Sequence, residues 1–144
     1  MKPQEIFNKA AVHLMGMEGP SLDQDSDACV YRGKDEDCEF NGQMCAVGVF
    51  IADEHYDCDF EGTDITGNRS VADAVAKSWG QYRLSDDQLD LLADLQAAHD
   101  ETSSNIPLPD FEFPDDTWST DIVAALDGVA TKFHLRFDPK GASA

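Results

Sequence analysis

The sequence predicts a mainly helical α+β fold, built as a single domain over residues 1–144 with about four helices and one small β-hairpin. Three observations support this prediction. The length is that of one domain, and such a chain can bury about two thirds of its unfolded surface. Apolar residues recur at helical spacing in four segments. One short segment, "CVYRG", has instead the β-branched and aromatic composition of a strand.

The first predicted helix covers residues 3–17. Pro3 suits the opening turn of a helix, and the Gly16 to Pro20 stretch ends it. The apolar residues of this segment share one face: Ile6, Phe7, Ala10, Ala11, Leu14 and Met15. We expect this face to pack into the core.

The predicted hairpin begins with "CVYRG", residues 29–33, and the Asn41-Gly42 pair that follows is typical of a tight turn. Residues 44–51 are a short apolar run, whose period does not separate a buried strand from a buried helix. We favour a helix that extends toward Tyr56.

Two helices are predicted in the middle of the chain. Ser70 is the expected N-cap of a short helix that Gly80 ends. The clearest helix covers residues 85–101, where Ser85 and Gln88 form a capping box. Its inward residues are expected to be Leu89, Leu92, Leu95, Gln96 and His99.

The last predicted helix runs from about Asp116 to His134. Its apolar residues are spaced by three or four: Trp118, Ile122, Leu126, Val129 and Phe133. Acidic loops are expected near residues 20–28, 34–42, 57–69 and 102–115.

The net charge of −19 is the strongest compositional signal. Acids outnumber bases 29 to 10, and the excess is spread over all three thirds of the chain. Such a surface repels nucleic acid and anionic membranes and attracts basic partners. Solubility or a salty habitat explains the acidity equally simply. The acids expected to bind a partner are Asp53, Glu54, Asp57, Asp59, Glu61, Asp86, Asp87, Asp115 and Asp116.

The sequence predicts a cytoplasmic protein. No signal peptide is recognised, and the longest apolar run, Cys45 to Ala52, is far shorter than the roughly 20 residues of a membrane span. In the cytoplasm, cysteines are more often free, metal-bound or catalytic than paired in disulfides.

Metal binding is an alternative with weak support. Cys29, Cys38, Cys45 and Cys58 are numerous enough for a zinc site, but no Cys-x₂-Cys pair holds two thiolates together. Two aspartate-rich loops resemble calcium loops in part, yet Lys34 and Asn68 stand where each would need its bidentate carboxylate. No cofactor motif occurs, and no cofactor is expected.

A cysteine nucleophile is the other alternative. It needs a thiolate and a histidine within hydrogen-bonding reach. Cys45 is the candidate nucleophile, with His99, which Asp100 follows, or His55 as the base. No local motif joins these residues.

Four motifs in this order resemble a group of small proteins encoded by bacteriophages and prophages. They are Cys-x-Tyr-Arg-Gly, Cys-Ala-Val-Gly, Ile-x-Asp-Glu-x-Tyr and Leu-Gln-x-x-His-Asp, and the matching residues are Cys29, Tyr31, Arg32, Gly33, Cys45, Asp53, Glu54, Tyr56, His99 and Asp100. The resemblance implies a phage origin and an infected bacterial cytoplasm, but no established activity. Cys38 and Cys58 depart from the group, which weakens the zinc alternative.

Structural roles are expected for Tyr31, Tyr56, Asp100 and Arg32. Arg32 is one of four arginines in a very acidic chain, so we expect it to pair with Asp53 or Glu54. The leading functional hypothesis is a non-enzymatic accessory protein. It would bind and inhibit or modulate a basic or nucleic-acid-binding host protein, as a mimic of nucleic acid. The alternatives are a cysteine-dependent enzyme and a metal-stabilised structural module.

Overall fold

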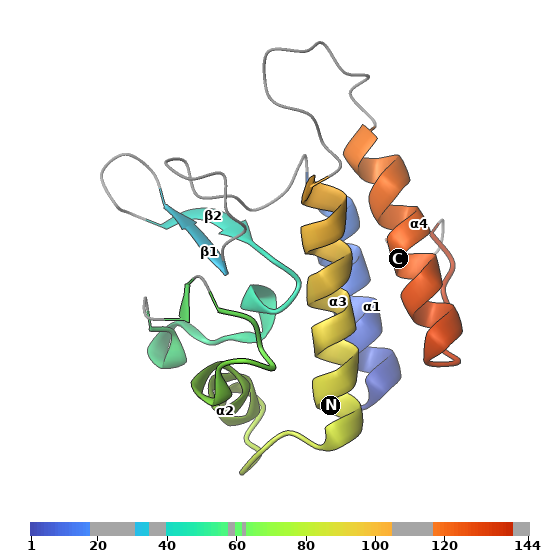
Figure 1. The fold of residues 1–144 in the computed structure, drawn as a ribbon. Helices are drawn as coiled ribbons and strands as arrows, with labels where there is room; N and C mark the ends of the chain where they lie inside the picture. The colour runs from blue at the N-terminus through green and yellow to red at the C-terminus, as the bar shows by residue number, and fades with distance from the viewer. Residues whose placement is uncertain (18–30, 35–39, 58–59, 62, 105–116, 140–144) are drawn as a thin grey trace.

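The computed structural model describes residues 1–17, 31–34, 40–57, 60–61, 63–104 and 117–139 (Figure 1). This part of the chain is mainly helical. Its elements are α1 (Pro3–Gly16), β1 (Arg32–Lys34), β2 (Phe40–Met44), the 3-10 turns η1 (Gly48–Phe50) and η2 (Asp53–His55), α2 (Arg69–Ser78), α3 (Asp86–Ser104) and α4 (Thr117–Lys132). None of the helices in these ranges is both long enough and apolar enough to cross a membrane.

Three of the helices form one side of the molecule. α3 packs against both α1 and α4, and α1 also contacts α4. The two strands and α2 lie on the other side of α3, with α2 below the strands in the view of Figure 1. The segment between β2 and α2 therefore has helices on two sides.

The predicted apolar faces of α1, α3 and α4 meet in the core. The buried apolar residues on these helices are Ile6, Phe7, Ala10, Ala11, Leu14, Leu91, Leu92, Leu95, Ala98, Ile122, Leu126, Val129 and Ala130. Leu91 was not among the residues predicted to face inward, and Leu89 is only half-buried. The side chain of Trp118 lies outside the described part.

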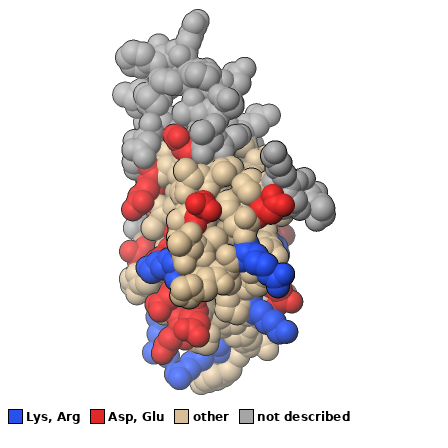
Figure 2. Space-filling model, turned by 90° about the vertical axis from the view of Figure 1, so that its right-hand side faces the viewer, with Lys and Arg blue, Asp and Glu red and all other residues tan. Residues whose placement is uncertain are grey.

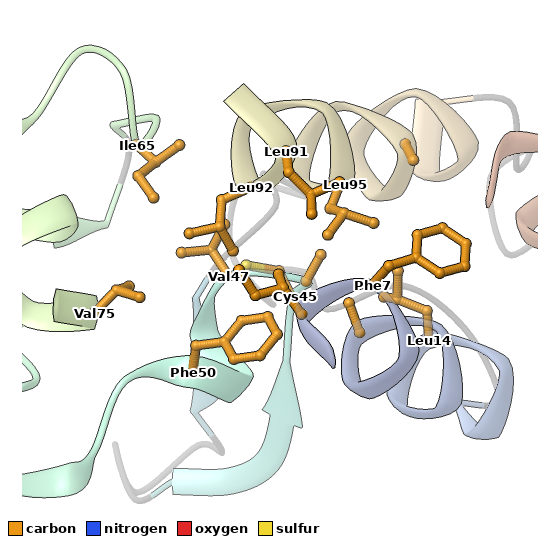
Figure 3. Packing of buried hydrophobic residues seen from close by; sticks show 14 of the residues in the cluster. Phe7, Leu14, Cys45, Val47, Phe50, Ile65, Val75, Leu91, Leu92 and Leu95 are labelled. Atoms are coloured by element: carbon orange, nitrogen blue, oxygen red, sulfur yellow. The ribbon is translucent and has the colours of Figure 1, made fainter. Parts of the chain in front are cut away.

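The Cys45 segment fills the centre of this core. Figure 3 shows Cys45, Val47 and Phe50 below the leucines of α3, with Phe7 and Leu14 on one side and Ile65 and Val75 on the other. The helix predicted to extend toward Tyr56 does not form. Ile51 and Ala52 are extended and separate the two short turns η1 and η2, and the backbone N–H of Ala52 donates to Ser78 Oγ at the end of α2 (2.8 Å) instead of to the preceding turn.

The two strands pair antiparallel, with Arg32 opposite Met44 and Lys34 opposite Phe40. Asn41-Gly42 was predicted to form a tight turn, but both residues lie inside β2. That prediction was wrong because strand pairing outweighs the local turn preference of two residues. Residues 35–39, which link the strands in sequence, lie outside the described part.

Helices α2 and α3 begin where a side chain a few residues away forms a hydrogen bond with the backbone of the first turn. The predicted capping box of α3 is present, since Ser85 N donates to Gln88 Oε1 (3.0 Å) and Gln88 N donates to Ser85 Oγ (3.2 Å). The N-cap of α2 is Asn68, not Ser70, and its side chain accepts from Ser70 N (3.0 Å). α3 continues to Ser104, three residues beyond the predicted end.

Candidate functional site

The sequence motifs meet around Tyr31, which is 2 % exposed. Its hydroxyl donates to the carbonyl oxygen of Thr63 (2.7 Å) and accepts from Gln96 Nε2 on α3 (3.0 Å). Burial raises the pKa of the Tyr31 phenol, so this hydroxyl stays protonated and remains a donor at neutral pH. Tyr31 therefore joins the start of the sheet to the middle of α3.

Gln96 continues this network into the loop before α2. Its Oε1 accepts from the backbone N–H of Ile65 (3.0 Å), and the side chain is buried. Both the NH₂ group and the carbonyl oxygen of the side-chain amide therefore form hydrogen bonds within the protein, as a buried polar side chain requires. The sequence placed Gln96 on the inner face of its helix, but no local signal identified its partners.

Glu61 is the acidic member of the network. It is half-buried, and its carboxylate accepts from Tyr31 N (3.0 Å) and from the hydroxyl of Tyr56 (2.8 Å). The ring of Tyr56 also makes an edge-to-face contact with Phe60, at 6.0 Å between ring centroids. Glu61 was predicted to bind a partner, and its two hydrogen bonds give it a structural role here.

Cys45 is near enough to Tyr31 to help raise the pKa of its phenol, and it is 2 % exposed. Its Sγ accepts from the backbone N–H of Gly48 (3.4 Å). Burial raises the pKa of the Cys45 thiol to about 12, and the negative charges of Asp100 and Glu61 act in the same direction. A cysteine nucleophile needs a thiolate, so this environment opposes the chemistry that the cysteine alternative requires.

The two histidines considered as bases occupy different surroundings. His99 is fully buried on α3, with Nδ1 3.0 Å from Asp100 Oδ1. His55 lies in η2, partly exposed, with Nε2 3.9 Å from Glu54 Oε1. The Cys45 thiol accepts its hydrogen bond from Gly48 in its own turn, and neither histidine is the donor.

His13 on α1 was not singled out from the sequence. Its Nε2 lies 2.6 Å from the carbonyl oxygen of Met44, the last residue of β2. Burial lowers the pKa of His13, and the nearby His99 and Lys9 lower it further. The neutral ring donating to Met44 therefore connects α1 to the end of the sheet.

Several predicted residues cannot be placed in this site. Cys29, Cys38, Cys58, Asp59, Asp115 and Asp116 lie outside the described residues, as does the side chain of Arg32. The four-cysteine zinc site and the ion pair from Arg32 to Asp53 or Glu54 thus stay predictions. Within the described residues, no cluster of three or more His, Cys, Asp or Glu side chains is arranged to hold a metal ion.

Two of the acids predicted to bind a partner, Glu54 and Asp57, line a cavity next to this network. The predicted binding residues Asp53, Glu54 and Asp57 are exposed on and beside η2, and Asp86 and Asp87 are exposed in the first turn of α3. A cavity of about 370 Å³ is lined by Glu54, Asp57, Asp73, Tyr56, Phe60 and Lys77, among others. We call this the acidic cavity.

The acidity is not uniform over the surface. Figure 2 shows the side of the molecule on which α4 lies in Figure 1. Acidic side chains extend over the described part of this face, whereas basic side chains gather in its lower half. Among the described residues of this face, basic side chains are thus confined to the lower half, whereas acidic side chains occur in both halves.

Comparisons with known proteins returned no significant match, either to a family model, to a curated protein or to a solved structure. The resemblance to small phage proteins therefore stays a prediction.

Proposed function

We propose that this protein is a non-enzymatic accessory protein that binds a basic, nucleic-acid-binding protein through its acidic surface and inhibits or modulates it. In the setting that the phage resemblance implies, the partner is a host protein in the cytoplasm of an infected bacterium. The chain would occupy the partner's nucleic-acid site in place of a phosphate backbone.

The observation that carries this proposal is the acidic cavity, whose lining residue Tyr56 is connected to the buried core by hydrogen bonds. Glu54 and Asp57 lie at its edge, with the aromatic rings of Tyr56 and Phe60 beside them. A lysine or arginine side chain of a partner would meet these carboxylates beside the partly exposed ring of Tyr56, which is a favourable setting for a cation. The hydroxyl of Tyr56 donates a hydrogen bond to Glu61, and Glu61 accepts another from the backbone of Tyr31. This side of the cavity is therefore connected to the core.

The cysteine alternative has less support. Cys45 is buried and protonated, with no described hydrogen bond to a base. A variant with Cys29, Cys38 and Cys58 changed to serine isolates the Cys45 thiol. We expect iodoacetamide to label it only after denaturation, and rapid labelling of the folded protein at neutral pH would support the enzyme instead.

The binding proposal is tested by capture from nuclease-treated bacterial lysate, followed by titration of the purified partner. We expect one basic nucleic-acid-binding protein, released by rising salt and displaced by competing DNA. The triple variant Asp53→Asn, Glu54→Gln, Asp57→Asn should weaken binding strongly.

A control variant separates the contribution of the cavity to binding from the contribution of the net charge. Asp90→Asn, Glu101→Gln, Asp127→Asn changes the net charge by the same amount at exposed positions away from the cavity. It should weaken binding less than the first triple variant. Equal losses would assign binding to overall charge alone, and affinity that does not change with salt would contradict the proposal.

A further inference from the structure

A second cavity, of about 590 Å³, opens between the first turns of α2 and α3. It is separate from the acidic cavity, and the two share only Asp73 among their described lining residues. We call it the arginine cavity, because Arg69 and Arg83 both line it. Its size is typical of sites for small organic ligands, which occupy roughly 300–1,000 Å³.

The two arginines are unusual in this chain. Arg69 is the first residue of α2, and Arg83 precedes the N-cap of α3 by two residues. Both side chains are exposed, and neither makes an ion pair or side-chain hydrogen bond with a described residue. In a protein with 29 acids and 10 bases, two such guanidinium groups at one cavity leave donors available for a ligand.

The rest of the lining limits the kind of ligand. Leu84, Leu89 and Ala72 supply apolar surface, and Leu84 and Leu89 pack on the core from the other side. Asp73 and Asp86 also line the cavity, so the two positive charges are formally balanced by two negative ones. Because the two carboxylates offset part of the attraction of the two guanidinium groups, a multiply charged phosphate is disfavoured relative to a ligand with a single negative charge.

We propose that the arginine cavity binds an organic monocarboxylate with an apolar body. The guanidinium groups of Arg69 and Arg83 hold the carboxylate, because their planar arrays of donors match its two oxygens. The body lies over Leu84 and Leu89. This site is independent of the acidic cavity and of the protein partner proposed above.

The test uses the full chain labelled with ¹⁵N and titrated with 3-phenylpropionate as the probe. We expect saturable shifts of backbone amide signals in residues 65–73 and 83–89. The neutral 3-phenylpropanamide should bind at least about tenfold more weakly, since it lacks the charge that strengthens hydrogen bonds to arginine. Acetate should also bind more weakly, because it lacks the apolar body.

Matched variants identify the arginines as the cause. Arg69→Gln and Arg83→Gln should each reduce affinity about tenfold or more while the rest of the spectrum stays unchanged. Arg136→Gln removes the same charge at an exposed position outside the cavity and should leave affinity unchanged. Equal binding of the amide, tighter binding of inorganic phosphate, or unaltered affinity in both cavity variants would overturn the proposal.

Discussion

At Gly48, the absence of a side chain lets the turn after β2 lie directly against the backbone of Tyr31. A Cβ atom at this position would overlap the carbonyl oxygen of Tyr31. That oxygen belongs to the backbone and cannot swing aside as the tip of a flexible side chain can. The contact between the two motifs that contain Tyr31 and Gly48 thus requires glycine.

Gly48→Ala should therefore destabilise the fold by about 3 kcal/mol, because either Tyr31 or the Cys45 turn must shift. The free energy of unfolding in urea measures this cost. Gly128→Ala is the control, since the added Cβ in α4 would meet no atom within 4 Å apart from its chain neighbours and the helix's own backbone. It should stabilise the protein by roughly 0.5–1 kcal/mol. Similar effects at both glycines would contradict the close approach.

Tyr31→Phe tests the buried network at a single atom. The change removes the hydroxyl that joins Thr63 O to Gln96 Nε2 and leaves the buried Gln96 amide without that partner. We expect a loss of about 1–3 kcal/mol in urea unfolding. Tyr82 is 97 % exposed, so Tyr82→Phe should change stability by less than about 0.5 kcal/mol. A neutral result at Tyr31 would show that its hydroxyl is not bonded in solution.

The N-cap residue of α2 differs from the one that the sequence predicted. Asn68 accepts the Ser70 N–H and has extended backbone angles, as an N-cap does. Ser70 lies inside the first turn, where its exposed hydroxyl makes no described hydrogen bond. We expect Asn68→Ala to cost about 1 kcal/mol and Ser70→Ala to cost only a few tenths. Thermal unfolding followed by circular dichroism distinguishes the two, and the reverse order would restore Ser70 as the cap.

The contact from His13 to Met44 links α1 to β2 and should make stability depend on pH. The folded pKa of His13 is below its unfolded value of 6.5, so the unfolded state binds more protons as pH falls below 6.5. The contribution of neutral His13 to the free energy of unfolding is therefore fully present above pH 6.5. It is lost as the pH falls from 6.5 toward the lowered pKa of the folded state. Lys9 and His99, which carry or can acquire positive charge nearby, act in the same direction.

His13→Gln should flatten this part of the pH profile, because glutamine does not titrate and its amide can still donate to Met44 O. Urea unfolding from pH 8 to pH 5 measures the profile. The variant and the parent should differ most in slope between pH 6.5 and pH 5. Parallel profiles would show that His13 is not the group responsible.

For the whole molecule, the charge of −19 opposes compaction. Segments 18–30, 35–39 and 105–116 each contain four acids and no Lys or Arg, so much of the excess lies between the described elements. Salt should relieve the repulsion, because the screening length falls from about 30 Å at 0.01 M to about 8 Å at 0.15 M. The fold is thus expected to be more stable in salt than in dilute buffer.

We expect the melting temperature to rise by several degrees between 0.01 M and 0.15 M NaCl. The triple variant Asp90→Asn, Glu101→Gln, Asp127→Asn should melt higher in dilute buffer and respond less to salt. Scanning calorimetry measures both. A melting temperature that is constant or falls with salt would mean that favourable ion pairs, such as Lys132–Asp94 at 2.6 Å, outweigh the repulsion.

The sequence by itself determined the helices α1, α3 and α4, the capping box at Ser85 and the acidic character of the surface. These features depend on side chains within about one helical turn of each other, or on composition, so a local pattern contains the information. It also pointed to Tyr31, Tyr56 and Asp100 as structural residues, although not to what they contact.

Only the tertiary structure decided the segment between β2 and α2 and the network around Tyr31. Gln96 is 65 residues from Tyr31, and Ser78 is 26 residues from Ala52. The arginine cavity likewise forms only when the starts of α2 and α3 come together. Contacts of this kind leave no periodic trace in the sequence, because each depends on where two distant elements pack, and that packing is set by the core as a whole.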